Sequence, residues 1–162
     1  MSELAGFTYT YLEGKGPRTL LMLHGTGGTQ ESILKIAPAI DADAHLLSPR
    51  GKVDENGMLR FFRRIGPGVF DTEDLKKRTD ELARFIQEAS KTHSIANDSL
   101  VGVGYSNGAN ILANLLCEHP GLVTRAILLR PMAASLTLQL PDLPSTSVFV
   151  ASGRNDEMAH PE

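Results

Sequence analysis

Residues 100–109 read LVGVGYSNGA, and they carry the clearest signal of the fold class in this chain. Its first six residues carry no charge and are mostly apolar, which is typical of a strand covered on both faces of a sheet. A helical pattern over residues 106–118 follows at once and ends before Pro120. Because a buried strand that runs directly into a helix is the unit from which parallel sheets are built, this stretch predicts the α/β class.

The same alternation extends along the rest of the chain. Apolar or β-branched runs predict further strands at residues 7–11, 19–24, 44–48, 126–129 and 148–151, with the first of them at the edge of the sheet. Helical periodicity predicts helices at residues 30–40, shortened or kinked by Pro38, and at residues 72–90, capped by Asp71 or Thr72. We therefore expect a mostly parallel sheet with helices on both faces, forming one α/β domain over residues 1–162.

Two segments lack a regular pattern. Residues 49–71 are rich in Gly, Pro and Arg and are expected to form a long loop. Three prolines keep most of the connection between the last two strands irregular: Pro131, Pro141 and Pro144. Ligands bind at the carboxyl ends of the strands in such sheets, so we look for reactive residues there.

Composition narrows the class of protein. The chain has 162 residues, a formal net charge of −3, 41% hydrophobic and 22% charged residues, which is typical of a globular domain. The acidic balance argues against a nucleic-acid partner, and no apolar run approaches the ~20 residues of a membrane span. The single cysteine, Cys117, excludes an intrachain disulfide, and the N-terminus lacks a signal-peptide pattern, so we expect a cytoplasmic location.

The sequence GYSNG at residues 104–108 places a serine where the strand becomes the helix. This is the context of a nucleophile elbow, in which a sharp turn exposes the serine hydroxyl at a helix N-terminus. Gly104 and Gly108 allow the strand and the helix to approach closely, and the helix dipole favours developing negative charge. We infer that Ser106 is a candidate nucleophile; the alternative is an ordinary N-cap serine in a glycine-rich turn.

A second glycine-rich segment, LHGTGG at residues 23–28, follows the first buried strand. An acyl-transfer site needs two backbone N–H groups directed at the oxyanion. Asn107, the residue after the candidate nucleophile, would supply one of them, and Thr26 in this loop would supply the other. We interpret His24 as a packed structural side chain that holds the loop, rather than as a catalytic group.

A third motif, SGRND at residues 152–156, follows the last predicted strand. It places Asp156 at the same edge of the sheet as Ser106 and downstream of it. An acid in this position fits a catalytic triad, in which it orients a histidine and stabilises the charged imidazole. The alternative is that Asp156 caps a helix that begins at Glu157.

Residues close to these motifs are candidates for contact with the substrate. In the segment 49–71, Arg60 is expected to bind an anionic group and Phe61 to line an apolar pocket. Tyr105, beside the serine, and Met132, in the sequence LRPM at 129–132, complete the predicted substrate-binding residues. The alternative is a loop with its phenylalanines in the core and its arginines paired with three acids: Asp54, Glu55 and Asp71.

With these motifs, the chain resembles the small carboxylesterase/phospholipase-type α/β-hydrolases, and it is similar to dienelactone hydrolases and to carboxylesterases linked to hydroquinone resistance. The resemblance rests on LHGTGG (23–28), SPRG (48–51), ENGMLRFFRR (55–64), GVFDTEDL (68–75), VGYSNGANI (103–111), LRPM (129–132) and SGRND (152–156). It implies the α/β-hydrolase fold and a serine hydrolase of small carboxylic esters that uses no metal or organic cofactor. It also implies Ser106 as nucleophile, Asp156 as acid, and Thr26 and Asn107 as oxyanion donors.

The departure from the family is the histidine. Family members carry the base in a Gly-His pair after a further helix and strand, whereas here only His160 follows Asp156 and the chain ends at Glu162. We therefore expect a fold truncated at its C-terminal edge and a 162-residue chain that is weakly active or inactive alone. The apolar last strand would then be an exposed edge along which two copies pair as a homodimer.

Two other classes stay open. The missing histidine allows a non-catalytic binding or interaction protein with the hydrolase fold. Gly102 and Gly104 after a strand resemble a dinucleotide fingerprint, which allows a nucleotide-binding module. Against that module, the third glycine falls at Gly108, and Arg130 stands where the fingerprint expects an acid.

Overall fold

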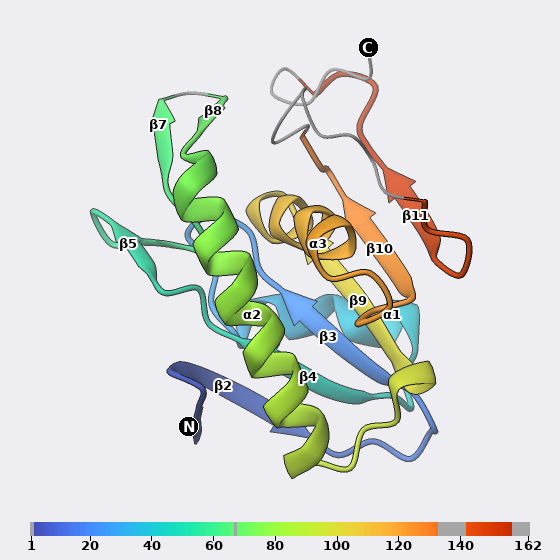
Figure 1. The fold of residues 1–162 in the computed structure, drawn as a ribbon. Helices are drawn as coiled ribbons and strands as arrows, with labels where there is room; N and C mark the ends of the chain where they lie inside the picture. The colour runs from blue at the N-terminus through green and yellow to red at the C-terminus, as the bar shows by residue number, and fades with distance from the viewer. Residues whose placement is uncertain (1, 67, 133–141, 157–162) are drawn as a thin grey trace.

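The computed structural model describes residues 2–66, 68–132 and 142–156, and its main sheet has the strand order β1-β2-β4-β3-β9-β10-β11 (Figure 1). From β4 to β11 all neighbouring strands are parallel, whereas β1 and β2 are antiparallel to their neighbours. The mostly parallel sheet predicted from the sequence is confirmed. Its strands are β1 (Ser2–Leu4), β2 (Phe7–Leu12), β3 (Thr19–Leu23), β4 (His45–Pro49), β9 (Leu100–Tyr105), β10 (Arg125–Leu129) and β11 (Ser147–Ala151).

The strand predicted at residues 7–11 is present, but it is not the edge of the sheet. The three-residue strand β1 pairs antiparallel with β2 and lies outside it, with Leu4 opposite Phe7. Ala5 and Gly6 join the two strands and both have positive φ, 49° and 74°. Such a two-residue turn suits a hairpin because its twist matches that of the strands. The edge assignment was wrong because three residues are too few to show a strand period.

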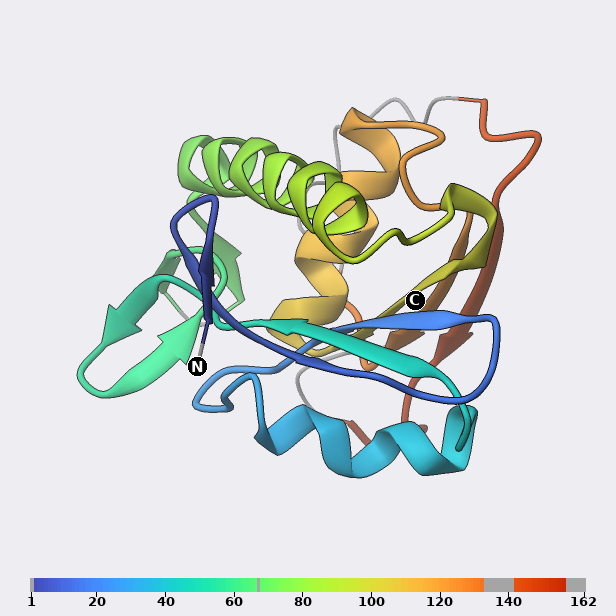
Figure 2. The same cartoon turned by 90° about the horizontal axis from the view of Figure 1, so that it is seen from below.

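Helices cover both faces of the sheet, as predicted (Figure 2). The helices α2 (Thr72–Thr92) and α3 (Asn107–Glu118) lie on one face, and η1 (Ser32–Ile36) with α1 (Ala37–Ile40) lies on the other. The segment predicted as one helix at 30–40 is therefore a 3-10 turn followed by a single α-helical turn, in agreement with the effect expected of Pro38. Asp71 caps α2, since its Oδ1 accepts a hydrogen bond from the Asp74 amide at 3.0 Å. The short turn η2 (Asn97–Ser99) precedes β9.

Two apolar clusters fill the spaces between these layers. The larger one joins the sheet to α2 and α3 and includes Phe85 and Leu112, each with no exposed surface. The smaller one joins the sheet to η1 and α1 and includes Met22 and Ile33. The strand β3 is buried at all five positions because both of its faces are covered.

The segment 49–71 is not a loop but contains two small hairpins. Strands β5 (Val53–Glu55) and β6 (Met58–Arg60) form the first, and β7 (Arg64–Gly66) and β8 (Val69–Phe70) form the second. Asn56 and Gly57 form the two-residue turn of the first hairpin, with φ of 54° and 82°. An Asn-Gly pair is the strongest short hairpin signal in a sequence, and the prediction of a loop was wrong because it did not use that pair.

The strand β11 ends the described sheet on the side opposite β1 (Figure 1). Its apolar side chains are exposed: Val148 by 45%, Phe149 by 62% and Val150 by 55%. An exposed apolar edge is open to pairing with another strand, and the homodimer expected along this edge stays a prediction, as does the expected truncation of the sheet. Most of the predicted irregular connection before β11 lies outside the described residues.

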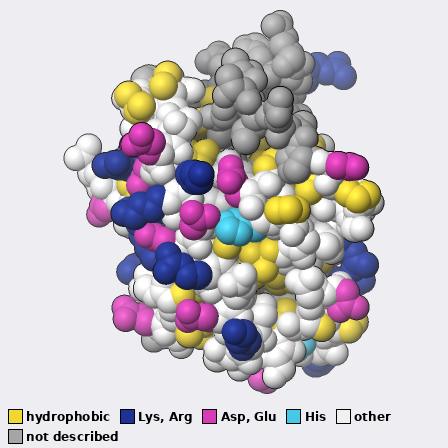
Figure 3. Space-filling model, viewed as in Figure 1, with side chains coloured by type: hydrophobic (Ala, Val, Ile, Leu, Met, Phe, Trp, Pro, Cys, Tyr) yellow, Lys and Arg dark blue, Asp and Glu magenta, His cyan; other side chains and the backbone are white. Residues whose placement is uncertain are grey.

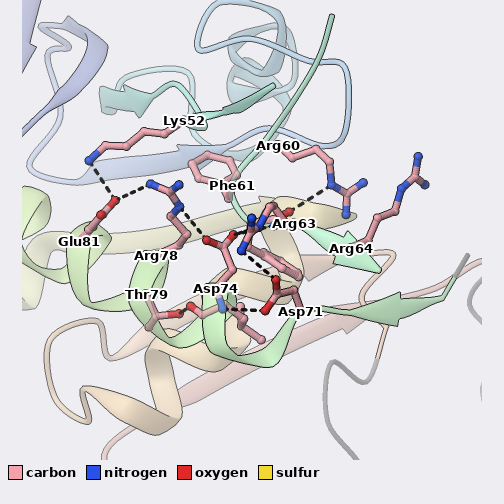
Figure 4. Close-up of polar contacts among 12 residues, drawn as sticks. Lys52, Arg60, Phe61, Arg63, Arg64, Asp71, Asp74, Arg78, Thr79 and Glu81 are labelled. Atoms are coloured by element: carbon pink, nitrogen blue, oxygen red, sulfur yellow. Dashed lines mark hydrogen bonds and ion pairs between the residues drawn. The ribbon is translucent and has the colours of Figure 1, made fainter. Parts of the chain in front are cut away.

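The surface carries no single-sign field on the face shown in Figure 3, where basic and acidic side chains are interleaved. Charged side chains pair along α2, among them Arg78 with Asp74 and Glu81, and Lys52 with Glu81 (Figure 4). Within the described ranges, no helix is both long and apolar enough to cross a membrane.

Candidate active site

Ser106 lies between the last residue of β9 and the first residue of α3, in the backbone geometry of a sharp elbow. Its φ is 51° and its ψ is −113°, a region that side-chain-bearing residues rarely adopt. The Ser106 amide donates to the Leu129 carbonyl of the neighbouring strand β10 at 2.9 Å, which fixes the turn. Its side chain makes no capping hydrogen bond, so Ser106 is not an ordinary N-cap serine.

The glycines around Ser106 allow this elbow because backbone passes where side chains would stand. A Cβ at Gly104 would lie 2.5 Å from the Gly108 carbonyl oxygen and 2.6 Å from Cα of Ala109, inside the helix. A Cβ at Gly108 would overlap the Leu23 carbonyl oxygen and lie 2.6 Å from that of His24, in the strand β3 and its extension. The close approach predicted from these glycines is confirmed.

A cavity of about 380 Å³ opens at the carboxyl ends of the strands, beside Ser106. It brings together most of the residues predicted from the sequence. The cavity is lined by Thr26, Met58, Arg60, Arg64, Gly68, Phe70, Tyr105, Ser106, Asn107, Asn110, Arg130 and Met132. Besides Arg60, the segment 49–71 contributes Met58, Arg64, Gly68 and Phe70 to the lining, and of these Met58 and Gly68 were not predicted from the sequence.

Phe61 does not line this cavity, so its predicted contact with substrate is wrong. Its side chain is only 2% exposed, and its ring packs on His24 with 4.7 Å between the ring centroids. Along this segment the chain turns its arginine toward the cavity and its phenylalanine into the core. Phe61 therefore follows the alternative weighed for this segment, in which the phenylalanines are core residues.

Thr26 and Asn107, the candidate oxyanion donors, both lie at the cavity wall. Asn107 is the first residue of α3, so its backbone N–H has no acceptor within the helix. The Asn107 side chain is buried and turned inward, with Oδ1 accepting a hydrogen bond from the Phe61 amide at 2.7 Å. Thr26 lies in the turn after β3, where the amide of Gly27 donates to the Leu59 carbonyl at 2.9 Å.

The segment 59–61 makes hydrogen bonds to the surroundings of both candidate oxyanion donors, Thr26 and Asn107. Besides the two backbone contacts of Leu59 and Phe61, Arg60 Nη1 donates to the Thr26 hydroxyl at 2.6 Å. Arg60 is 3% exposed, and its Nε donates to the Phe62 carbonyl at 3.1 Å. The sequence predicted the individual residues but not this arrangement, because it depends on the hairpin that the Asn-Gly turn forms.

Two arginines, Arg60 and Arg64, share one carboxylate, that of Glu55. Arg60 lies 3.7 Å from Glu55, and Arg64 donates to the same carboxylate at 3.1 Å. Burial lowers the pKa of Arg60, and the Arg64 charge lowers it further while Glu55 opposes both effects. Figure 4 shows Arg63 turned instead toward Asp71 and Asp74, in the cluster of charges along α2.

Asp156 lies just beyond β11, at the same edge of the sheet as Ser106. It forms a bidentate ion pair with Arg130, in which Arg130 Nη2 and Asp156 Oδ1 are 2.7 Å apart. The Asp156 carboxylate raises the pKa of Arg130 above its ordinary value. Arg130 lines the cavity, whereas Asp156 lies behind Arg130 and is linked to the cavity wall by this ion pair. The helix that Asp156 would cap in the alternative interpretation lies outside the described residues.

His24 is a packed structural side chain, as predicted. The ring is 1% exposed, Nδ1 hydrogen-bonds to the Gly25 carbonyl at 2.8 Å, and Nε2 accepts from the Gly51 amide at 3.0 Å. Burial lowers the pKa of His24, so the ring stays neutral at pH 7 and ties the glycine-rich loop to the segment after β4.

No histidine in the described part of the chain lines the cavity beside Ser106. His45 and His93 contact tyrosines of β2, and His119 pairs with Asp80 at 2.8 Å. The structural or solvated roles expected for these three are confirmed. His160 lies outside the described residues. The described residues also contain no group of three or more His, Cys, Asp or Glu side chains that could hold a metal.

Comparisons with known proteins decide the family. No family model matches the chain. The chain is 46% identical over 154 residues to a Bacillus subtilis protein named Putative hydrolase MhqD, covering 95% of this chain and 77% of that one. It also matches the crystal structure of the Bacillus cereus carboxylesterase with a TM-score of 0.91 and 44% identity, covering 95% of this chain and 74% of that one. The chain belongs to the carboxylesterases of the α/β-hydrolase fold.

A second structure agrees with this family. The carboxylesterase of Mesorhizobium loti matches with a TM-score of 0.94 and 33% identity, covering 99% of this chain and 78% of that one. The fold and the hydrolase class expected from the sequence are therefore confirmed. This carboxylesterase hydrolyses esters, and membership of the family disfavours the nucleotide-binding module.

Proposed function

We propose that this carboxylesterase cleaves small carboxylic esters through an acyl-enzyme on Ser106, with the oxyanion held by the backbone N–H groups of Thr26 and Asn107. The observation that carries the proposal is the backbone of Ser106, with a φ of 51° and a hydroxyl that caps no helix, at the wall of a cavity. Strained backbone conformations persist only where the surrounding structure enforces them, and they cluster at functional sites. At Ser106 the strained conformation places the side-chain hydroxyl at the cavity wall.

The proposed reaction has two halves. Ser106 Oγ attacks the ester carbonyl carbon while a base removes its proton, and the negative charge on the carbonyl oxygen is stabilised by the two N–H groups. The C–O bond to the alcohol then breaks, and the alcohol leaves with the proton held by the base. Water attacks the acyl-enzyme in the same way and releases the acid and free Ser106.

The base of this reaction is a histidine from outside the described residues. Asp156 is proposed to orient that histidine and stabilise its charged form. The position of the carboxylate after β11 supports this role, since β9, β10 and β11 are parallel neighbours and their carboxyl ends lie at one edge. The bidentate pair with Arg130 also fixes the Asp156 carboxylate at this edge of the sheet.

A fluorophosphonate probe tests the proposal on the full-length protein. An activated serine is expected to be phosphonylated within minutes, with the added mass on the peptide that contains Ser106. Heat-denatured protein is the control, because a serine without its base and oxyanion donors does not react. Absence of labelling in the folded protein would support the alternative, a binding protein with the hydrolase fold.

Replacing Arg60 with methionine is expected to lower kcat for the neutral ester p-nitrophenyl acetate by about tenfold to a hundredfold. The change removes the hydrogen bond that fixes Thr26, and loss of one oxyanion donor costs about 10²–10³ in kcat elsewhere. Steady-state kinetics separate the kcat effect from KM, and Arg60→Lys is expected to recover part of the loss. Arg63→Met is the control, because Arg63 is 60% exposed and pairs away from the cavity. An effect on KM alone would contradict the positioning role.

A further inference from the structure

The cavity beside Ser106 has an unusual charge pattern. Three arginines line it, Arg60, Arg64 and Arg130, while no acidic residue in the described part of the chain does so. Arg130 is neutralised one to one by Asp156. Arg60 and Arg64 share a single carboxylate, that of Glu55, so one positive charge at this wall has no counter-charge among these neighbours.

Arg64 is the member of this group that can meet a ligand. Its side chain is 41% exposed, whereas that of Arg60 is 4% exposed and already donates to Thr26 and Phe62. Arg64 uses its Nε and its backbone N–H on Glu55. A guanidinium has five N–H donors in a planar fork, so a bidentate contact through the Nη atoms is still open to an incoming carboxylate.

The rest of the lining limits what the anion is attached to. Met58, Phe70 and Met132 are apolar, so the space between Ser106 and Arg64 suits a short hydrocarbon chain. A cavity of about 380 Å³ holds a small molecule only. One uncompensated positive charge matches a monoanion such as a carboxylate better than a phosphate dianion.

We propose that Arg64, supported by the field of Arg60, binds a carboxylate on the substrate, and that the preferred substrates are short esters carrying a free carboxylate, such as half-esters of dicarboxylic acids. The proposal rests on the proposed function, because it places this carboxylate in the cavity that holds Ser106. It extends that function from small esters in general to anionic ones.

Kinetics with a matched pair of esters test the proposal on the full-length protein. Monoethyl succinate carries the carboxylate, and ethyl butyrate is a neutral ester of similar length. The wild-type protein is expected to favour the anionic ester in kcat/KM, and Arg64→Gln to lower the anionic-to-neutral ratio by about tenfold, through KM. The control Arg63→Gln is expected to keep the wild-type ratio, since Arg63 pairs with Asp71 and Asp74. An unchanged ratio in Arg64→Gln would overturn the proposal.

Calorimetric titration with succinamate, a monoanion with an amide in place of the ester, separates this proposal from the proposed function. Succinamate is expected to bind the wild-type and Arg63→Gln proteins at low ionic strength and to bind Arg64→Gln at least tenfold more weakly. If neither ester is hydrolysed but succinamate binds in this Arg64-dependent way, the anion site stands and the proposed catalysis fails. If the esters are hydrolysed but succinamate binds all three proteins equally, Arg64 is not the anion site.

Discussion

Replacing Ser106 with alanine in the full-length protein is expected to lower the turnover of p-nitrophenyl butyrate by a factor of about 10³ or more. Members of a catalytic triad act as a unit, so the loss of the nucleophile alone removes most of the rate that the site provides. What remains comes from binding and from the oxyanion donors, which the substitution leaves in place. Initial rates at saturating ester, measured by release of p-nitrophenol, give the ratio.

Ser94→Ala is the matched control for this experiment. Ser94 also has a positive φ, 54°, and it lies on the exposed surface after α2. The control therefore has the same change of side chain at a residue that also has a positive φ, away from the cavity. Equal turnover by the Ser106→Ala and wild-type proteins would show that ester cleavage occurs elsewhere, and it would leave the elbow without a chemical role.

The sequence predicted the sheet and the elbow well because both depend on local patterns. Buried parallel strands are continuous apolar runs, and the close approach at Gly104 and Gly108 leaves small residues at fixed spacing. The positions of Ser106, Asn107 and Thr26 at one cavity follow from the rule that the carboxyl ends of parallel strands share an edge. The sheet and the elbow can therefore be predicted without knowing which side chains contact one another in the folded protein.

The contacts of the segment 59–61 could not be predicted in the same way. Whether Arg60 or Phe61 faces the cavity depends on the register of the hairpin, and a shift of one residue exchanges the two faces. The Asn56-Gly57 turn fixes that register with Glu55 opposite Met58. The composition of the segment indicated arginines and phenylalanines near a site, but the turn decides whether Arg60 or Phe61 lies at the cavity wall.

Replacing Gly108 with alanine is expected to lower the free energy of unfolding by about 2–3 kcal/mol. Two effects oppose each other at this position. In a helix, glycine to alanine normally stabilises by about 1 kcal/mol, because alanine loses less backbone entropy. Here the new Cβ would overlap the carbonyl oxygen of Leu23 and come within 2.6 Å of that of His24. Overpacking typically costs about 1–3 kcal/mol and occasionally more, and contact with two backbone carbonyl oxygens belongs above that range, at about 3–4 kcal/mol. After the gain of about 1 kcal/mol in helix propensity is subtracted, a loss of about 2–3 kcal/mol remains.

The overlap cannot be relieved cheaply because the obstacle is backbone. Leu23 ends β3, a strand buried at every position between β4 and β9, and His24 is held by Gly51 and by its own loop. Moving them apart would separate α3 from the sheet and disturb the turn at Ser106. For a chain of this size, a loss of about 2–3 kcal/mol lowers Tm by about 5–10 °C in a thermal melt.

Gly66→Ala is the control, since a Cβ there meets nothing within 4 Å. The melting temperature of this variant is expected to stay within about 2 °C of the wild type. A rise in Tm for Gly108→Ala would mean that helix propensity decides the outcome, and that the strand and the helix are not held in contact at this point.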